Sequence, residues 1–497
     1  MSRWSRREML ERSMFAAAAA ALAGPAAHDG ALSAEDAVPA PGPNGLLNVA
    51  VVGVKGRGGN HLEAFLARKD ARVTGIVDVD SRPAIIGQAM RLVEKKNGKP
   101  PRFEQDLRKM LEDKDLDAVS IATTDHTHVL LALWAIQAGK HVYVEKPVSH
   151  NIFEGRQLVK AARKYRRICQ VGHQCRSSKG IRDLMAFLHG GKLGKVRIAR
   201  GLCYKRRGSI GKKADEAPPE GVNYDLWLGP APYRPYNPNR FHYNWHWFWD
   251  YGNSDMTAQG VHQMDIARWG LNKRELARRV ICLGGRLGYE DDGEVPNTQV
   301  AWYDYGDCEL VFETRGLDTD AYSIDPAGRD KQKEARIGVI FHCEGGTVVN
   351  PSYTGAVAFD LDGKVIQSFG GRAEDHFGNF LAAIRSGRHE DLACDIEEGH
   401  LSAALCHMGQ ISWRLGQRQP LAQDKPFGDI DAADEAFVRM RAHLKDQKLP
   451  PDTTQIQVGP LLVMDPKTER FVGHDKANAD LLMKREYRKP FVVPDEI

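Results

Sequence analysis

The sequence predicts an α/β protein with a doubly wound, Rossmann-type N-terminal domain, followed by an α+β domain with an open, mostly antiparallel sheet. Between residues 46 and 171, short β-branched runs alternate with helical stretches, which is typical of parallel strands joined by crossover helices. After residue 172, longer segments alternate apolar and polar residues, which indicates an antiparallel sheet with one covered face. The 497 residues are also enough to bury two cores.

Four segments are expected along the chain. Residues 1–45 form a leader and a linker rich in Ala, Pro and Gly, with too few bulky apolar side chains to pack a core. Residues 46–171 form the doubly wound domain and residues 172–449 the α+β domain. Residues 450–497 contain several prolines and mix polar with apolar residues, so we expect a tail that wraps the surface.

The strands of the first domain are expected where β-branched residues cluster, with a weaker strand near Phe103. They cover residues 46–52, 72–78, 117–123, 141–146 and 168–171. In the second domain, strands are expected at residues 195–204, 278–289, 298–305, 308–314 and 336–343. Helices are expected at residues 256–269, 376–386 and 397–415.

The N-terminus resembles an export signal of the twin-arginine type. Ser5-Arg6-Arg7 precedes a weakly hydrophobic, alanine-rich stretch and small residues suited to cleavage. Met9 and Glu11 depart from the fullest form of this signal, so an ordinary amphipathic leader stays open. We expect a periplasmic or otherwise exported protein without a membrane span after signal cleavage, because no segment approaches 18 continuous apolar residues.

Charge and cysteine content narrow the partners. The 69 basic and 65 acidic residues are mixed along the chain and leave a net charge of +4, without the basic stripe that nucleic-acid binding requires. We therefore expect a small, largely uncharged partner and no nucleic acid. The eight cysteines form no C-x-x-C pair and no zinc-type spacing with histidine, so no metal site is predicted. Most of them should be buried as small hydrophobic residues.

The first strand runs directly into a glycine-rich turn. Glycines let a backbone turn tightly and approach a pyrophosphate, whose charge is met by the N-terminus of the following helix. Lys55 replaces the middle glycine of the usual G-x-G-x-x-G pattern. We expect a dinucleotide to be bound here by Gly53, Lys55, Gly56, Arg57 and Gly58. A glycine turn that binds no dinucleotide is the alternative.

Asp78 ends the second strand, about twenty residues after the turn. At this position a carboxylate accepts hydrogen bonds from the hydroxyls of the adenosine ribose, which favours NAD over NADP. Arg82 lies close by in sequence and weakens that preference, so NADP stays open as the cofactor.

The segment Ala122-Thr123-Thr124-Asp125-His126-Thr127-His128 follows the fourth strand, at the sheet edge where ligands of this fold bind. We expect Thr123, His126 and His128 to line the nicotinamide end of the cofactor, with His128 starting the next helix. A helix-capping role is the alternative for His126. The His-x-His spacing lacks a carboxylate-rich set of partners and is weak evidence for a metal.

Glu145-Lys146-Pro147 ends the fifth strand. Pro147 disfavours the helical conformation for Lys146, so the lysine should be held extended at the carboxyl end of the strand, where it can face the nicotinamide. Burial and a neighbouring positive charge would lower its pKa enough for proton exchange at neutral pH. We include Glu145 and Lys146 among the cofactor-binding residues.

These three motifs, in this order, resemble the Gfo/Idh/MocA oxidoreductases, and the resemblance covers roughly residues 46 to 416. It implies a dinucleotide-binding N-terminal domain and a C-terminal domain built on an open, largely antiparallel sheet. It also implies that Lys146 contacts nicotinamide and substrate and takes part in proton transfer. Assembly into a homo-oligomer is a further implication.

A second family landmark is the D-x-G-x-H-x-x-D pattern, which places a histidine beside the substrate hydroxyl. Gly260, His262 and Asp265 fit this pattern, but Ala258 stands where the leading acid is usual. The resemblance implies catalytic roles for His262 and Asp265, and Asp265 is close enough on the same helical face to orient the imidazole. Asp255 or His262 alone could replace the missing acid. A core histidine that caps its own helix is the alternative.

An aromatic cluster precedes this landmark, and its rings could either pack the core or stack on a sugar. The cluster consists of Trp245, Trp247, Phe248, Trp249 and Tyr251. For the substrate pocket we predict Arg176, His246, Trp247 and His262. The regions around residues 224–238 and 394–416 resemble an exported bacterial branch of the family.

An exported enzyme has no free nicotinamide pool, so the cofactor should stay bound and be restored within each turnover. The leading hypothesis is a sugar or polyol oxidoreductase that depends on NAD(P). The second is a redox-neutral enzyme that uses transient oxidation to cleave, eliminate or epimerise a glycoside. The third is a dinucleotide-binding module without catalysis.

Overall fold

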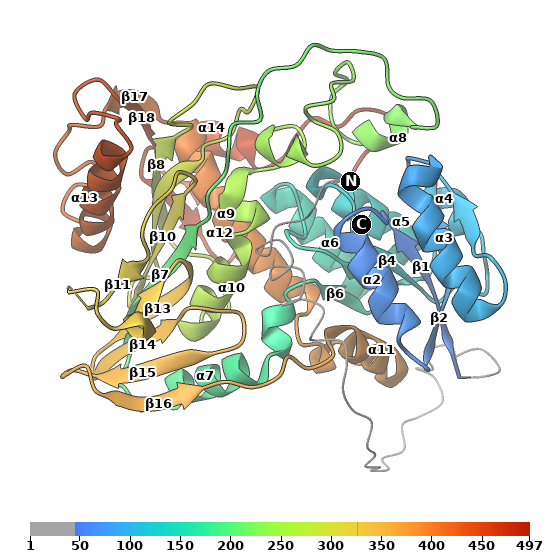
Figure 1. Ribbon diagram of the computed structural model, residues 1–497, viewed down its shortest axis with the longest axis horizontal. Helices are drawn as coiled ribbons and strands as arrows, with labels where there is room; N and C mark the ends of the chain where they lie inside the picture. The colour runs from blue at the N-terminus through green and yellow to red at the C-terminus, as the bar shows by residue number, and fades with distance from the viewer. Residues whose placement is uncertain (1–44, 326) are drawn as a thin grey trace.

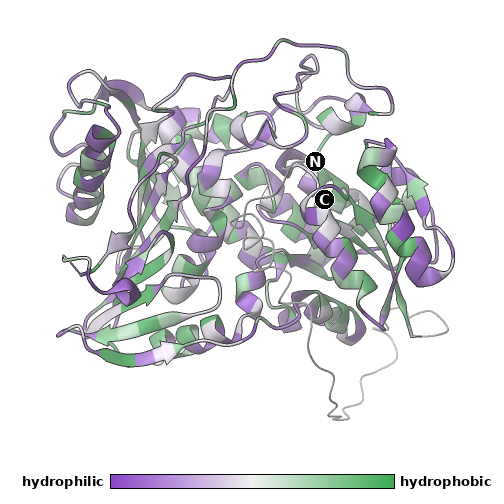
Figure 2. Ribbon diagram, in the orientation of Figure 1, coloured by the Kyte–Doolittle hydropathy of each residue, from purple (hydrophilic) through white to green (hydrophobic). Residues whose placement is uncertain are grey.

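The computed structural model describes residues 45–325 and 327–497 and places two sheets side by side (Figure 1). Residues 1–44, which carry the predicted export signal, lie outside the described residues. Apolar residues follow the strands of both sheets, and hydrophilic residues cover much of the outlying helix α13 (Asp431–Asp446) (Figure 2). This distribution is expected when each sheet forms the centre of its own core.

The first sheet is parallel throughout and has the strand order β3-β2-β1-β4-β5-β6. This confirms the predicted doubly wound domain, including the weak strand near Phe103. The order reverses between β1 and β4, and ligands of this fold bind at such a reversal. The strands are β1 (Leu47–Val52), β2 (Ala71–Val77), β3 (Arg102–Glu104), β4 (Ala118–Ile121), β5 (His141–Val144) and β6 (Cys169–Val171).

Helices cover both faces of this sheet. One face packs against α2 (Arg57–Leu66), α3 (Pro83–Asn97) and, from far along the chain, α11 (His376–Ser386). The other packs against α4 (Leu107–Met110), α5 (His128–Gln137) and α6 (Ile152–Lys164). The four residues of each of β4 and β5 are buried, because crossover helices exclude water from the whole width of a parallel sheet.

The second sheet has twelve strands and is mostly antiparallel, as predicted. Only β7 and β10 pair in parallel. Its main path is β16-β15-β14-β13-β7-β10-β9-β8-β18-β17, with β19 attached to β8 and β20 to β19. The strands are β7 (Val196–Tyr204), β8 (Arg279–Gly285), β9 (Thr298–Asp304), β10 (Glu309–Arg315), β13 (Ile337–Cys343), β14 (Gly346–Asn350), β15 (Ala356–Asp360), β16 (Val365–Phe369), β17 (Gln417–Pro420), β18 (Gln455–Val458), β19 (Leu462–Asp465) and β20 (Arg470–Val472).

Helices α7 (Lys179–His189), α10 (Val261–Gly270) and α12 (Ile396–Arg414) cover one face of this sheet, and α13 covers part of the other. The expected helix over residues 256–269 is two helices, α9 (Ser254–Ala258) and α10. The chain bends at Gly260, where a Cβ atom would lie 2.6 Å from Phe312 and 2.8 Å from the Met256 carbonyl oxygen. A small two-stranded sheet, β11 (Tyr322–Ser323) with β12 (Glu334–Ala335), completes this half.

The C-terminal tail is more deeply integrated than the sequence predicted. Its strands β18 and β19 pair with β8 and extend the second sheet. After α14 (Lys476–Leu482) the chain returns to the first domain, where Phe491 and Val493 are buried among the side chains of α5 and α6. The prolines predicted a tail that wraps the surface, but the tail buries the apolar side chains of Phe491 and Val493.

Arg156 on α6 joins the two halves of the molecule. Its guanidinium binds Glu397 on α12 at 2.7 Å and Glu469, just before β20, at 2.5 Å. His400 of α12, which is fully buried, contacts Glu469 at 3.0 Å. Burial alone would raise the pKa of the Glu469 carboxyl, but His400 and Arg156 outweigh it and lower that pKa to about 2.

We expect Glu469→Gln to lower the free energy of unfolding by about 1–3 kcal/mol at pH 7, because it weakens charged hydrogen bonds in a buried place. The folded-state pKa of Glu469 lies below its ordinary value of 4.5. Its contribution is therefore present above pH 4.5 and is lost as the pH falls toward 2. Denaturant midpoints at pH 7 and pH 3 measure this difference.

Glu397→Gln is the matched control, because Glu397 binds the same arginine but its side chain is 36% exposed. It should shift the midpoint less than Glu469→Gln. Equal shifts for the two variants, or a Glu469→Gln shift that is undiminished at pH 3, would contradict this role.

Candidate active site

A cavity of about 490 Å³ lies at the carboxyl ends of β1, β2, β4 and β5, where the strand order reverses. The later part of the chain closes it with segments around Trp227 and residues 242–246, with Ala258 and with Phe491. The structure brings together ten of the residues that the sequence singled out: Gly53, Lys55, Gly56, Arg57, Asp78, Thr123, His128, Glu145, Lys146 and His246.

The glycine turn at one side of the cavity fits the pyrophosphate of a dinucleotide. Gly53 has φ 78°, and a Cβ there would lie 2.8 Å from the Ala122 carbonyl oxygen. Gly56 has φ 71°, and α2 begins at Arg57 without a side-chain cap, which leaves amide groups of its first turn for an anion. Gly58 lies just inside α2, where a Cβ would lie 1.6 Å from the Gly53 carbonyl oxygen. Gly58 therefore serves close packing of the turn and is not part of the cavity wall.

Asp78 is fixed by the turn that it faces. Its two carboxylate oxygens accept hydrogen bonds from the amides of Val54 and Asp80, both at 3.0 Å. Burial raises the pKa of this carboxyl. Arg82, which we expected to weaken the preference for NAD, is held by Asp80 at 2.6 Å and is not among the residues that line the cavity.

Glu145 is a buried anion in the cavity wall. It contacts Arg57 at 2.8 Å and His61 at 3.0 Å, and Gln174 donates a hydrogen bond to it at 2.9 Å. Burial would raise its pKa, but Arg57 and His61 hold it well below the ordinary value. A Cβ on Gly172 would lie 2.8 Å from this carboxylate, so the residue opposite must be glycine.

Lys146 lies at the carboxyl end of β5, in the cavity wall. Its Nζ donates a hydrogen bond of 2.7 Å to the carbonyl oxygen of Ala258, 112 residues later in the chain. Burial lowers the pKa of its amino group, and the charges of Arg57 and Lys205 act in the same direction against Glu145 and Asp125. The amine is therefore easier to deprotonate than a surface lysine.

The two predicted histidines after β4 have different surroundings. His128 begins α5 and contacts the Pro147 carbonyl oxygen at 2.8 Å, which ties this helix to the lysine loop. His126 is buried, turns away from the cavity and contacts the Trp227 carbonyl oxygen at 3.0 Å. The expectation that His126 lines the nicotinamide end is therefore corrected to a packing role between two loops.

The aromatic segment was interpreted either as core packing or as a surface that stacks on a sugar, and its rings differ in whether they reach the cavity. Trp245 and His246 line the cavity, with their rings stacked at 3.6 Å. Trp245 also belongs to a buried aromatic cluster with Trp247, Phe248 and Tyr251, and the last three do not line the cavity. The prediction that Trp247 lines the substrate pocket is wrong. The Arg207 guanidinium lies over its ring, 5.1 Å from the ring centroid.

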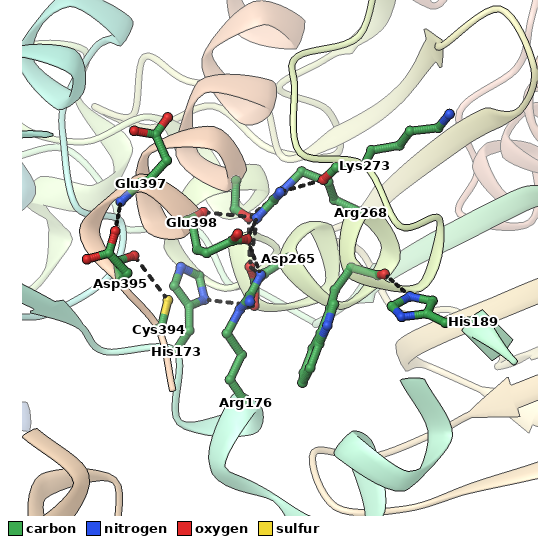
Figure 3. A network of polar contacts seen from close by, with 12 residues as sticks. His173, Arg176, His189, Asp265, Arg268, Lys273, Cys394, Asp395, Glu397 and Glu398 are labelled. Atoms are coloured by element: carbon green, nitrogen blue, oxygen red, sulfur yellow. Dashed lines mark hydrogen bonds and ion pairs between the residues drawn. The ribbon is translucent and has the colours of Figure 1, made fainter. Parts of the chain in front are cut away.

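Figure 3 shows Arg176 pointing toward Asp265. Arg176 is not among the residues that line the cavity, so its prediction as a substrate-pocket residue is wrong. Its guanidinium makes two 2.8 Å hydrogen bonds to Asp265 and one of 3.0 Å to Glu398, and Arg268 completes the buried group at 2.6 Å from Glu398. Arg176 and its neighbours hold the pKa of Asp265 far below its ordinary value, although burial acts the other way.

His262 is not oriented by Asp265 as predicted. Its ring meets the buried ring of His173 edge-on, with the centroids 5.6 Å apart, and His173 lies 3.8 Å from Asp265. Burial holds the pKa of His262 well below its ordinary value, and the positive charge of Lys146 acts in the same direction. His262 therefore lies near Lys146 as a neutral ring, outside the cavity lining.

Sequence reasoning missed several residues of the cavity. Asp125 lies in the motif that we singled out but was assigned no role, and Trp227, His242 and Phe491 come from loops and the tail. Only Asp125 carried a usable signal, because it directly follows a buried strand at the ligand edge. The other three arrive through tertiary packing.

We expect Gly58→Ala to disrupt the turn, because the new methyl group would overlap the Gly53 carbonyl oxygen. Calorimetric titration should then show NAD affinity lowered by at least about tenfold, with a lower thermal midpoint. Gly59→Ala is the control, since its Cβ would lie 3.6 Å from the nearest atom, the Val54 carbonyl oxygen. Unchanged NAD affinity in Gly58→Ala would contradict this account of the turn.

Comparison with known sequences identifies both halves of the chain. Residues 47–173 match the Gfo/Idh/MocA model described as an oxidoreductase family, NAD-binding Rossmann fold. Residues 191–334 match the model of the same family's C-terminal alpha/beta domain. The Rossmann domain of this protein is therefore an NAD-binding domain.

Two relatives from Saccharopolyspora erythraea are similar to this chain. Inositol 2-dehydrogenase 2 is 26% identical over 385 residues, which cover 76% of this chain and 95% of that protein. A glycosyl hydrolase family 109 protein is 30% identical over 210 residues, 40% of this chain. The match spans 45% of that protein's length.

Solved structures share the fold at low identity. The WlbA dehydrogenase from Bordetella pertussis, in complex with NADH and UDP-GlcNAcA, has a TM-score of 0.52 and 18% identity, and the match covers 73% of this chain and 95% of that one. Aldose-aldose oxidoreductase from Caulobacter crescentus has a TM-score of 0.53 and 14% identity over 73% and 97%. With two models of one family matching more than half of the chain in domain order, this protein belongs to the Gfo/Idh/MocA family of oxidoreductases.

Proposed function

We propose that this protein is an exported, NAD-dependent oxidoreductase that oxidises a hydroxyl group of a sugar or polyol and keeps its cofactor bound between turnovers. The observation that carries the proposal is the desolvated Lys146, which lines the same cavity as the glycine turn and Asp78. Inositol 2-dehydrogenase 2, similar over most of its length, supports the polyol class.

The residues of the cavity fit NAD from end to end. The N-terminus of α2 would hold the pyrophosphate, Asp78 the ribose of the adenosine, and Thr123 and Lys146 the nicotinamide end. Bound NAD supplies the acceptor for the two electrons and the hydrogen that leave the substrate carbon. Asp78 favours NAD over NADP, because a carboxylate repels a 2′-phosphate.

Lys146 is the base that we assign to the substrate hydroxyl. Its hydrogen bond to Ala258 fixes the amine in the cavity wall, and burial keeps a larger fraction of it unprotonated than in water. A proton from the hydroxyl moves to this amine as the carbon is oxidised. In the reverse direction the ammonium returns the proton to the carbonyl oxygen.

The substrate end of the cavity suits an uncharged ligand rich in hydroxyl groups. His246 Nδ1 is placed to donate a hydrogen bond to the Tyr243 carbonyl oxygen, which leaves Nε2 as an acceptor. Burial lowers the pKa of His246 to about 3, so the ring stays neutral at pH 7. Trp245, which stacks on His246, adds an aromatic ring to the same wall, and sugars pack on such rings.

Two segments close over the cavity and favour a cofactor that does not exchange. The stretch after β7 runs across the top of the molecule to α8 (Tyr224–Leu228), and it is tied to the first domain by Ser81, whose amide donates to Gly221, and by Asn223, whose amide donates to Val79. His242 contacts Asp80 at 2.8 Å. From the tail, Phe491 packs on Trp134.

The proposal of export rests on the twin-arginine pattern in residues 1–44. Export would require the cofactor to stay bound. No helix among residues 45–325 and 327–497 is long and apolar enough to cross a membrane. We further propose that the protein assembles as a homo-oligomer, as the family resemblance implies.

A second candidate function is redox-neutral cleavage, elimination or epimerisation of a glycoside. The similarity to a glycosyl hydrolase family 109 protein favours it, as does Ala258 in place of an acid. Here the oxidised carbon acidifies a neighbouring C–H bond, and product forms without net reduced cofactor. A screen of polyols, sugars and glycosides that records both product and nicotinamide absorbance separates the two candidates.

We expect Lys146→Met to lower turnover by about 10²–10⁴-fold while NAD remains bound, because it removes the proton acceptor but not the pyrophosphate site. Turnover is measured on the best substrate of that screen, and the dinucleotide released by denaturation is quantified in parallel. Lys179→Met is the control, since Lys179 is an exposed lysine paired with Asp183.

The control variant should retain full activity and full cofactor content. Unchanged turnover in Lys146→Met would instead favour a dinucleotide-binding module without catalysis. Protein that contains no dinucleotide and takes up neither NAD nor NADP would contradict the proposed function as a whole.

A further inference from the structure

Asp125 is a buried carboxyl group in the active-site cavity that no part of the mechanism above uses. It starts the short 3₁₀ turn Asp125–Thr127 after β4, and the residue is only 3% exposed. Its Oδ2 atom has no hydrogen-bond partner, yet the residue lines the cavity together with Lys146. Leaving a buried polar atom unpaired costs about 1–3 kcal/mol, so this position calls for an explanation.

Asp125 and Lys146 are placed to influence each other. Their strands β4 and β5 are neighbours in the parallel sheet, so the two residues follow adjacent strand ends at the same edge. The charge of Lys146 lowers the pKa of Asp125, and the charge of Asp125 raises the pKa of Lys146. The Lys146 amine donates its hydrogen bond to Ala258 and not to Asp125, and the buried Oδ2 atom of Asp125 has no hydrogen-bond partner.

No acid from the second domain competes for this role at α9. Position 258 is alanine, and its contribution to the site is the backbone carbonyl that holds Lys146. Asp255, which we considered as a substitute for the missing acid, is bound by two nitrogens of Arg207, each at 2.6 Å. Asp125 lines the cavity, and no ion pair is found for it among the described residues.

We propose that Asp125 is the proton store of the active site, exchanging a proton with Lys146 in each half-reaction. This inference rests on the proposed function. In oxidation, the substrate hydroxyl proton passes to the Lys146 amine, and the carbon-bound hydrogen leaves with two electrons to the bound NAD⁺. The ammonium then gives the proton to the Asp125 carboxylate, so the alcohol, NAD⁺ and a carboxylate become a carbonyl compound, NADH and a carboxylic acid.

The local electrostatics support a carboxyl that can hold a proton. Burial raises the pKa of Asp125 well above its ordinary value, and Glu145 acts in the same direction, while Lys146 opposes both. Burial lowers the pKa of Lys146. The other titratable groups that interact with the lysine are Arg57, His128, Glu145, His173, Cys175, Cys203, Lys205, His246 and His262.

Proton release on cofactor binding tests the proposal without requiring catalysis. In protein freed of its dinucleotide we expect the Lys146–Asp125 pair to hold one proton at neutral pH. The positive charge of NAD⁺ should expel this proton, whereas the uncharged nicotinamide of NADH should not. Titration calorimetry in buffers of different ionisation enthalpy should therefore show about one proton released with NAD⁺ and close to none with NADH.

Asp125→Asn is the decisive variant, because it keeps the size of the side chain and removes its titration. We expect proton release with NAD⁺ to fall by more than half, NADH affinity to stay within about threefold, and turnover to fall by about 10²-fold. Asp183→Asn makes the same chemical change at an exposed site and should leave all three unchanged.

The outcomes are distinct. Proton release in Asp125→Asn equal to that of the unsubstituted protein, or equal release with NAD⁺ and NADH, would overturn the role of Asp125 while leaving the oxidoreductase intact. Failure of both dinucleotides to bind the unsubstituted protein would overturn the proposed function itself. Retained NADH affinity in Asp125→Asn shows that the variant is folded, so its proton count decides the question.

Discussion

Lys146 is held between two parts of the chain that lie 112 residues apart, through its hydrogen bond to the Ala258 carbonyl oxygen. This contact requires Lys146 to lie just after the end of β5 and helix α9 to end beside it. Partial burial by both lowers the pKa of the amine, so a larger fraction of it is unprotonated and able to take up a proton than in a free lysine. Glu145, held by Arg57 and His61, keeps a compensating negative charge next to it. The site is therefore a joint product of two domains.

Buried ion pairs also stabilise the packing of the second domain, on the side away from the cavity. Asp265 and Arg176 pair within the core, and Arg268 joins them through Glu398 of α12. A buried charge without its partner is strongly unfavourable, so these contacts fix how α10 meets α12. The resemblance to the family pattern implied a catalytic role for Asp265, but its carboxylate is paired with Arg176 within the core.

The first domain was predictable because its signals are local. A strand, a glycine turn and a helix follow one another within twenty residues, and Lys146 could be placed from Pro147 and the strand before it. The contacts of Arg176 and Trp247 could not be predicted, because a residue's type and its local secondary structure do not say which neighbour its side chain will contact. Phe491 reaches the cavity only after the tail has crossed the molecule. The helix α13 was not among the helices named from the sequence, although its buried residues Ala433, Phe437, Met440 and Leu444 recur at helical spacing.

In the proposed mechanism Lys146 faces the reacting end of a bound NAD, and a crystal structure of the protein with NAD and a polyol tests this arrangement most directly. We predict the pyrophosphate at the N-terminus of α2 and the Lys146 Nζ within about 3 Å of a substrate hydroxyl beside the nicotinamide. A nicotinamide ring that points away from Lys146, with the substrate hydroxyl out of the lysine's reach, would contradict the account.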